Sequence, residues 1–203
     1  VLASGLDSKS LRNILGEIQR SNLIEQTENA NEFVFIHDQI QQAFSHFLPD
    51  EEQRKFHLEI ARAINRSKNE KLYVYELADH YLSAKLSEDS KAALDATLSA
   101  GLKAMSDFAP QEAYQYFQTA TEMSERLKLS LPLQVLNGRA EASVLLGKYE
   151  EAYLLLKNLL TLLEDPVARA RVHNRLSRIY AFQREIHLSW EHVQLGLKEI
   201  GHR

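Results

Sequence analysis

A small-bulky-small pattern, repeated along the second half of the chain, most constrains the fold. A small residue is followed by a bulky one four positions later and by a third residue seven positions later. The best copy has Ala at both small positions, the second has a larger last residue, and the third is looser: Ala113, Phe117 and Ala120; Ala152, Leu156 and Leu159; Ser189, Val193 and Gly196. The leading residues lie 39 and 37 positions apart. Because positions i, i+4 and i+7 share one helix face, the pattern predicts helices that approach closely at regular intervals.

The rest of this region also favours long helices. Only 7 Gly and 4 Pro occur among 203 residues, too few for a fold with many turns. From Leu72 onward, breaks are expected near 86–87, 109–110, 130–132, 147–148, 165–166 and 184–185. The short connections make consecutive helices antiparallel neighbours. We assign the aromatic residues of this region to the packing between helices: Tyr114, Tyr116, Phe117, Tyr149, Tyr153, Tyr180 and Trp190.

The first part of the chain has a different pattern. We expect a helix over 7–22 capped by Asp7 or Ser8, then strands over 23–27 and 32–36 joined by the polar turn 28–31. A helix follows over 37–48, and Asp50 with Gln53 predicts a capping box for the next one. A helix followed by a hairpin is the latter half of a winged helix. The loop-like stretch 66–71 is the expected domain boundary.

The segment from Leu146 to Ala152, with Gly147, Lys148 and Tyr149 at its centre, resembles the turn between the two helices of a tetratricopeptide repeat. This resemblance implies a mainly α chain: an α-α superhelix of degenerate tetratricopeptide-like repeats, preceded by a partial winged helix with one β-hairpin. The two domains would be 1–66, with the partial winged helix and its connecting helices, and 67–203, with the helical repeats. Such repeats bind protein partners on a concave surface.

A wider resemblance covers most of the chain. It includes the hairpin with Phe33 and Phe35, the run Ile36-His37-Asp38, and then 54–61, 77–81 and 196–201. In this order the segments resemble bacterial STAND-class signalling ATPases, relatives of the AAA and NB-ARC proteins that are fused to kinases, cyclases or transcription regulators. The resemblance implies a regulatory arm for protein–protein interaction in cytoplasmic signal transduction, without enzymatic activity of its own. Its partners would be a protein or peptide and the ATPase core of its own full-length chain. ATP or ADP and Mg would be bound only in that full-length protein.

His37 and Asp38 are the candidate nucleotide-sensing residues. Ile36-His37-Asp38 resembles the Met-His-Asp motif of NB-ARC switch proteins, in which the histidine contacts the β-phosphate of ADP. An imidazole at a helix N-terminus lies beside free backbone N–H groups, which suits an anion. The alternative is that both residues only cap the helix.

A basic row on the expected helix 166–182 is the candidate partner-binding groove. Arg171, Arg175 and Arg178 share one face, and the repeat register adds Asn174. These residues suit an acidic partner, and the alternative is a solvated charged face. Tetratricopeptide proteins that clamp a C-terminal carboxylate use the positions of Arg171 and Arg175. Their other clamp positions fall on uncharged residues, which argue against such a clamp: Leu98, Leu102 and Gly138.

Other functions lack the residues that they need. No Gly-x-x-x-x-Gly-Lys-Ser/Thr motif occurs, so we expect no ATP hydrolysis by this chain, and the start at Val1 instead of Met leads us to expect a longer natural protein. The eight histidines show no metal-binding spacing, and there is no cysteine. The net charge of −4 favours neither nucleic acid nor an anionic membrane. Two alternatives stay open: a stand-alone tetratricopeptide adaptor, and a winged-helix DNA-binding regulator.

Overall fold

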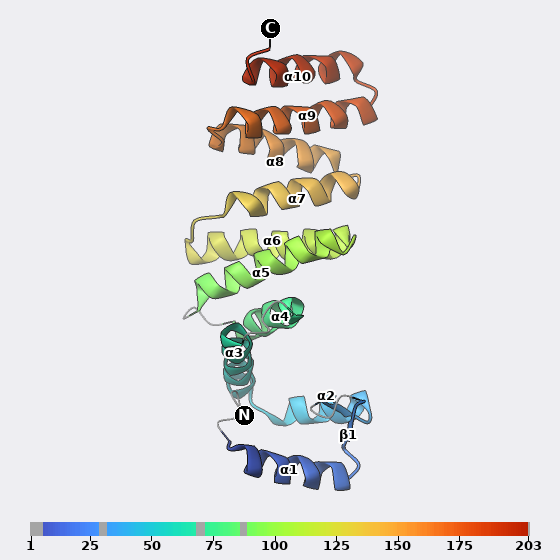
Figure 1. The fold of residues 1–203 in the computed structure, drawn as a ribbon, viewed down its shortest axis with the longest axis vertical. Helices are drawn as coiled ribbons and strands as arrows, with labels where there is room; N and C mark the ends of the chain where they lie inside the picture. The colour runs from blue at the N-terminus through green and yellow to red at the C-terminus, as the bar shows by residue number, and fades with distance from the viewer. Residues whose placement is uncertain (1–5, 29–31, 68–71, 86–88, 203) are drawn as a thin grey trace. The chain divides into compact units, whose positions relative to one another are not determined.

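The computed structural model describes residues 6–28, 32–67, 72–85 and 89–202. Within these ranges the chain forms ten helices and one two-stranded antiparallel sheet (Figure 1). The prediction of a mainly α chain is confirmed. The chain divides into two compact units, Val1–Glu88 and Asp89–Arg203.

The first unit contains a helix, a hairpin and three further helices: α1 (Ser8–Arg20), β1 (Ile24–Gln26), β2 (Phe33–Phe35), α2 (Asp38–Phe47), α3 (Asp50–Arg66) and α4 (Val74–Ala84). The predicted hairpin is confirmed, since Ile24 pairs with Phe35 and Gln26 with Phe33. Residues 29–31 of the predicted turn lie outside the described residues. Asp7 caps α1 as predicted, accepting hydrogen bonds from the backbone N–H groups of Lys9 and Ser10 at 2.8 and 3.0 Å.

The predicted capping box at the start of α3 is wrong. The helix begins one residue earlier, so Pro49 occupies the N-cap and Asp50 is already helical. Proline has no N–H for a glutamine side chain to satisfy. The Gln53 side chain instead donates from Nε2 to the Leu48 carbonyl at 2.8 Å.

Helices α3 and α4 pack against each other and supply most of the buried residues of the first unit: Leu58, Ala61, Leu77, Ala78, Tyr81 and Ala84. His57 and His80 meet across this contact with their Nδ1 atoms 2.8 Å apart. The predicted domain boundary after residue 66 falls between these two helices. Residues 68–71 of that stretch lie outside the described residues.

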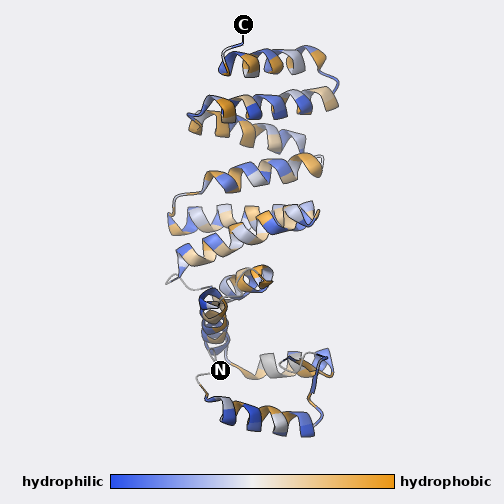
Figure 2. Cartoon of the chain, viewed as in Figure 1, coloured by the Kyte–Doolittle hydropathy of each residue, from blue (hydrophilic) through white to orange (hydrophobic). Residues whose placement is uncertain are grey.

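The second unit is a row of six helices, in which helices consecutive in the chain lie side by side: α5 (Ser90–Ser106), α6 (Pro110–Leu127), α7 (Leu133–Leu145), α8 (Tyr149–Leu162), α9 (Pro166–Phe182) and α10 (Ile186–Glu199) (Figure 1). All predicted breaks after residue 89 are confirmed, and the one at 86–87 lies outside the described residues. Each of these helices carries both hydrophobic and hydrophilic residues along its length (Figure 2).

The small-bulky-small pattern forms the centre of this unit. Ala113, Phe117 and Ala120 on α6 are fully buried. The Phe117 ring fills the space beside two glycines: a Cβ added to Gly101 on α5 would lie 2.7 Å from the ring, and one added to Gly138 on α7 only 2.3 Å. The second copy, on α8, is also buried, and the third has only Gly196 buried. The phenylalanine therefore holds three helices together because two of them have no side chain at the contact.

One aromatic assignment is wrong. Trp190 on α10 is 61% exposed, whereas Phe117 is fully buried and Tyr153 and Tyr180 are partly buried. Its helix has α9 on one side, and within residues 89–202 no other helix makes a substantial contact with α10. Among the described residues of the second unit, no helix other than α9 therefore packs on α10, and the face predicted to be buried is exposed.

Candidate functional site

A cavity of about 530 Å³ lies among α7, α8 and α9. We call it the α7–α9 groove, and it is lined by Leu133, Gln134 and Asn137 of α7, Leu159 and Leu163 of α8 and its end, and Ala168, Arg171, Val172 and Arg175 of α9. Apolar side chains from all three helices contribute to the lining, and the two arginines supply its positive charge. Such a combination of apolar surface with a few polar groups is typical of a binding site.

Two features of the sequence position α9 beside the groove, namely a cap at its N-terminus and an apolar face that packs on its neighbours. Asp165 caps it by accepting from the backbone N–H of Ala168 at 2.7 Å, and Pro166 takes the first helical position, as predicted. Val172, Leu176 and Ile179 are buried against α8 and α7. With this face buried, Arg171 and Arg175 lie on the side of α9 that lines the groove.

Arg169 ties α9 to both neighbouring helices. Its Nη1 donates to the Leu160 carbonyl at the end of α8 at 2.5 Å, and its Nε donates to Glu199 on α10 at 2.8 Å. The hydrogen bond from Arg169 lowers the pKa of the Glu199 carboxyl. Arg169 is therefore a structural residue of the helix row.

The two groove arginines have different surroundings. Arg175 donates from Nη1 to Asn137 Oδ1 at 2.6 Å and from Nη2 to Glu141 Oε2 at 3.3 Å. The Arg175–Glu141 pair is partly solvated, with side chains 30% and 49% exposed, so it is worth little and an incoming group can replace it. Arg171 is exposed and makes no hydrogen bond or ion pair within the described part of the chain. Its guanidinium is available to a ligand.

The structure brings together three of the four predicted groove residues. Arg175 lines both the α7–α9 groove, with Arg171, and a smaller adjoining cavity of about 90 Å³, with Arg178 and Leu145. Asn174 lies elsewhere, in a hollow of about 190 Å³ between α9 and α10. The three arginines therefore form a continuous basic row, and Asn174 belongs to a different surface.

Sequence reasoning missed Asn137. Gly138, which was not expected to serve as a clamp residue, is buried against Phe117. The preceding residue, Asn137, lines the groove and accepts a hydrogen bond from Arg175. One signal could have identified it: Asn137 and Asn174 lie 37 residues apart, the spacing of the last two pattern copies.

His37 and Asp38 lie at the start of α2, both exposed. His37 is the N-cap residue, but its side chain makes no capping hydrogen bond, and Asp38 is the acidic residue of the first turn. A helix cap through the His37 side chain is thus not formed. Among the described residues, no side chain of another element forms a hydrogen bond or an ion pair with His37 or Asp38, so their nucleotide-sensing role stays a prediction.

Two other properties bear on function. Among the described residues, no cluster of three or more histidine, cysteine, aspartate or glutamate side chains could hold a metal ion. In the same part of the chain, no helix combines the length and apolar character that a membrane crossing needs.

No protein-family model matches the sequence, and a search of curated proteins finds no match.

Proposed function

We propose that this chain is the regulatory and protein-binding arm of a larger STAND-type signalling ATPase and performs no catalysis itself. The observation that carries the binding role is the α7–α9 groove, which combines an apolar lining with the uncompensated charge of Arg171. The order of elements supports the wider assignment. A helix, a hairpin and a helix that starts at His37-Asp38 come first, and a row of helices follows.

We interpret the six helices of the second unit as three degenerate tetratricopeptide-like repeats that stack into a superhelix. The pairs are α5–α6, α7–α8 and α9–α10. The spacing supports this, since α8 and α10 each have 14 residues and begin 37 residues apart, at Tyr149 and Ile186. In this arrangement the first helix of each pair lines the concave surface, which places Arg171, Arg175 and Arg178 in the partner-binding groove.

The partner of the groove is a protein or peptide segment that carries carboxylates next to an apolar side chain. The apolar side chain would lie against Leu133 and Leu163, and a carboxylate would accept hydrogen bonds from Arg171. A second carboxylate would replace Glu141 on Arg175, with little loss because that ion pair is weak. Guanidinium–carboxylate pairs are among the stronger hydrogen bonds in proteins, so they would contribute both affinity and orientation.

The first unit would connect this arm to the ATPase core of the full-length protein. By resemblance, part of a winged helix would be formed by α1 and the hairpin, and His37 with Asp38 would sense the ADP held by that core. Several large apolar side chains of this unit are exposed, as expected for a surface that another domain covers: Ile14, Val34, Phe35, Phe47 and Phe56. Exchange of ADP for ATP would then shift the population between an inactive and an active arrangement of the cytoplasmic signalling protein.

The binding role is tested with a labelled probe. A fluorescein-labelled peptide of alternating Glu and Leu is titrated with the full 203-residue chain, next to a matched peptide in which Lys replaces every Glu. The acidic peptide should bind and the basic one should not. Arg171→Glu should weaken binding by at least about tenfold, the equivalent of about 1.4 kcal/mol and close to the lower end of what one hydrogen bond to a charged group contributes.

Arg126→Glu is the matched control, because Arg126 is an exposed arginine of the same unit that does not line the groove. Its affinity for the acidic peptide should equal that of the wild type. Equal binding of the two peptides, or equal losses in the two variants, would contradict a binding role for the groove.

A further inference from the structure

The polar side chains of the α7–α9 groove present mainly hydrogen-bond donors. Arg171 and Arg175 lie about one helical turn apart on α9, and a guanidinium group donates but does not accept. Asn137 lines the groove from α7, and its Oδ1 accepts from Arg175 Nη1 at 2.6 Å. The oxygen of this amide is therefore occupied, and its NH₂ group makes no hydrogen bond within the described part of the chain.

The basic row beside these donors carries more positive charge than one carboxylate balances. Among the described residues, no acidic side chain lines the groove itself, and the adjoining cavity of about 90 Å³ adds Arg178 and Glu141. Glu141 lies 3.3 Å from Arg175, is 49% exposed and screens it only weakly, whereas Arg171 and Arg178 form no ion pair in the ranges described. Three positive charges and one negative charge leave a net charge of +2.

The groove lies within the row of helices and not at its end. Its walls are α7, α8 and α9, and α6 and α10 pack on the two outer members of this set. A cavity of about 530 Å³ has room for more than an anion, and Leu133 and Leu163 offer apolar surface beside the arginines. The ligand therefore combines a multiply charged anion with an apolar group.

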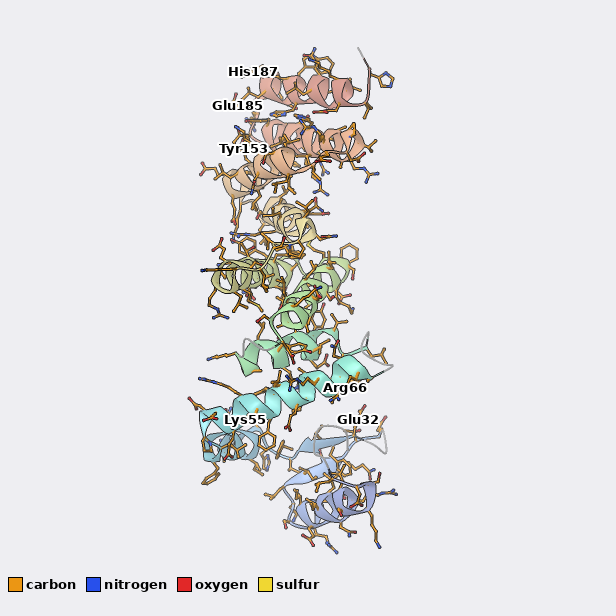
Figure 3. The ribbon with its side chains drawn as sticks, turned by 90° about the vertical axis from the view of Figure 1, so that its left-hand side faces the viewer. Glu32, Lys55, Arg66, Tyr153, Glu185 and His187 are labelled. Carbon is orange, nitrogen blue, oxygen red and sulfur yellow. The ribbon has the colours of Figure 1, made fainter. Side chains whose placement is uncertain are left out.

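The apolar part of the lining suits an aliphatic group and not a nucleobase. No aromatic side chain is among the described residues that line the groove. The tyrosines of α8 pack elsewhere, since Tyr149 stacks on Phe182 with ring centroids 5.9 Å apart, and Tyr153, labelled in Figure 3, meets Tyr180 edge-on at 5.8 Å. A free nucleotide would find no ring on which its base could stack.

We propose that the α7–α9 groove binds a phosphorylated side chain in a segment of a partner protein that has an aliphatic residue beside it. A phosphate monoester carries about −1.5 to −2 charges at pH 7 and three acceptor oxygens, whereas a carboxylate has one charge and two oxygens. The phosphate matches the net charge of +2 and the donors of Arg171, Arg175 and Asn137. The aliphatic side chain lies against Leu133 and Leu163.

This inference rests on the binding role proposed for the groove and specifies its ligand. One phosphorylated residue takes the place of the two carboxylates of an acidic segment, so only one charged side chain has to be ordered on binding. Contact with the partner then depends on its phosphorylation. The groove is thereby a contact that a kinase and a phosphatase acting on the partner switch on and off.

Three fluorescein-labelled peptides test the identity of the ligand. They share a sequence of alternating Ser and Leu and differ only at the central position, which is phosphoserine, Glu or unmodified Ser. Each peptide is titrated with the full 203-residue chain, and binding is followed by fluorescence anisotropy. The phosphoserine peptide should bind at least about tenfold more tightly than the Glu peptide, because it adds a charge and a charge-assisted hydrogen bond. The unmodified peptide should not bind.

Asn137→Leu removes the amide donor and keeps a side chain of similar size. It should weaken binding of the phosphoserine peptide by at least about tenfold. It should leave the affinity for the peptide of alternating Glu and Leu unchanged, because the arginines already satisfy the oxygens of a carboxylate. Asn158→Leu is the matched control, since Asn158 is an exposed asparagine of α8 that does not line the groove, and its affinity for each peptide should equal that of the wild type.

The outcomes separate this inference from the proposed function. Equal binding of the phosphoserine and Glu peptides, or equal effects of Asn137→Leu and Asn158→Leu, would overturn the phosphate ligand and leave the acidic partner in place. Inorganic phosphate that binds as tightly as the phosphoserine peptide, measured by competition, would show that the groove holds a free anion and would also overturn the proposal. Failure of every peptide to bind, including that of alternating Glu and Leu, would contradict the proposed function as well.

Discussion

Replacement of Gly138 by alanine tests the packing that holds α5, α6 and α7 together. The added Cβ would lie 2.3 Å from Cζ of Phe117, whereas carbon atoms in contact prefer about 3.5–4.0 Å. The ring has little room to retreat, because it also lies beside Gly101 of α5, where an added Cβ would be 2.7 Å from Cε1, and because Phe117 is fully buried. Either the ring or the whole of α7 must therefore move.

The expected cost follows from two opposing effects. Overpacking of a well-filled core costs about 1–3 kcal/mol, and the confinement of Phe117 on two sides favours the upper end of this range. Alanine recovers about 1 kcal/mol of helix propensity over glycine. The net loss is about 2 kcal/mol in the free energy of unfolding, which lowers the melting temperature by about 8 °C in a unit of this size.

Thermal unfolding followed by circular dichroism measures this loss. Gly16→Ala is the control, because Gly16 lies within α1 with no atom within 4 Å of an added Cβ, so propensity alone should stabilise that helix. Combining Gly138→Ala with Phe117→Leu should cost less than the sum of the single changes, since the smaller side chain relieves the overlap. A Gly138→Ala variant as stable as the wild type would refute the close approach of α6 and α7 at this glycine.

Three further predictions follow from individual residues. Burial lowers the pKa of both His173 and His192, whose Nδ1 atoms lie 3.0 Å apart between α9 and α10. Glu199, Arg169, Glu191 and Lys157 also act on this pair, and Tyr180 stacks on His192. Because both pKa values in the folded state lie below the unfolded value of 6.5, the unfolded chain binds protons first, so stability should be full above pH 6.5 and fall as the pH drops below 6.5. Melting temperatures measured across this pH range test the prediction. A melting temperature that does not change with pH would contradict it. Ala152→Leu at a fully buried position should cost about 1–3 kcal/mol, and an unchanged melting temperature would show that α8 does not pack closely there. His37→Ala should change the free energy of unfolding of the isolated chain by no more than about 0.5 kcal/mol, since the exposed side chain makes no capping hydrogen bond. In the full-length protein, the same change should lower the amount of ADP retained and raise signalling without stimulus. Unchanged ADP retention would contradict the sensing role.

The helices could be predicted from the sequence because strong local signals mark their ends. Asp165 with Pro166, Pro110 and Gly147 each fall at a helix boundary, where their backbone preferences decide the structure. The burial of Phe117 also followed from its spacing relative to two alanines. These features depend on neighbours within one or two helical turns.

The exposure of Trp190 could not be predicted, since a helical pattern shows which face is apolar but not whether another helix covers it. Asn137 was missed for a related reason. The first two pattern copies are 39 residues apart and the next two 37, so two additional residues lie somewhere between α6 and α8. Which of the two neighbours Asn137 and Gly138 faces the groove is decided by packing in three dimensions, because Gly138 is buried against Phe117 and Asn137 is left to line the groove.

The nucleotide content of the full-length protein tests the central claim most directly. The full-length protein and the 203-residue chain are purified in parallel, and the nucleotide released from each by denaturation is quantified by chromatography. If the chain is the arm of a signalling ATPase, we expect close to one ADP per full-length chain and none for the 203-residue chain, together with a Gly-x-x-x-x-Gly-Lys-Ser/Thr motif upstream of Val1. A full-length protein that carries neither bound nucleotide nor that motif would contradict the assignment to a signalling ATPase.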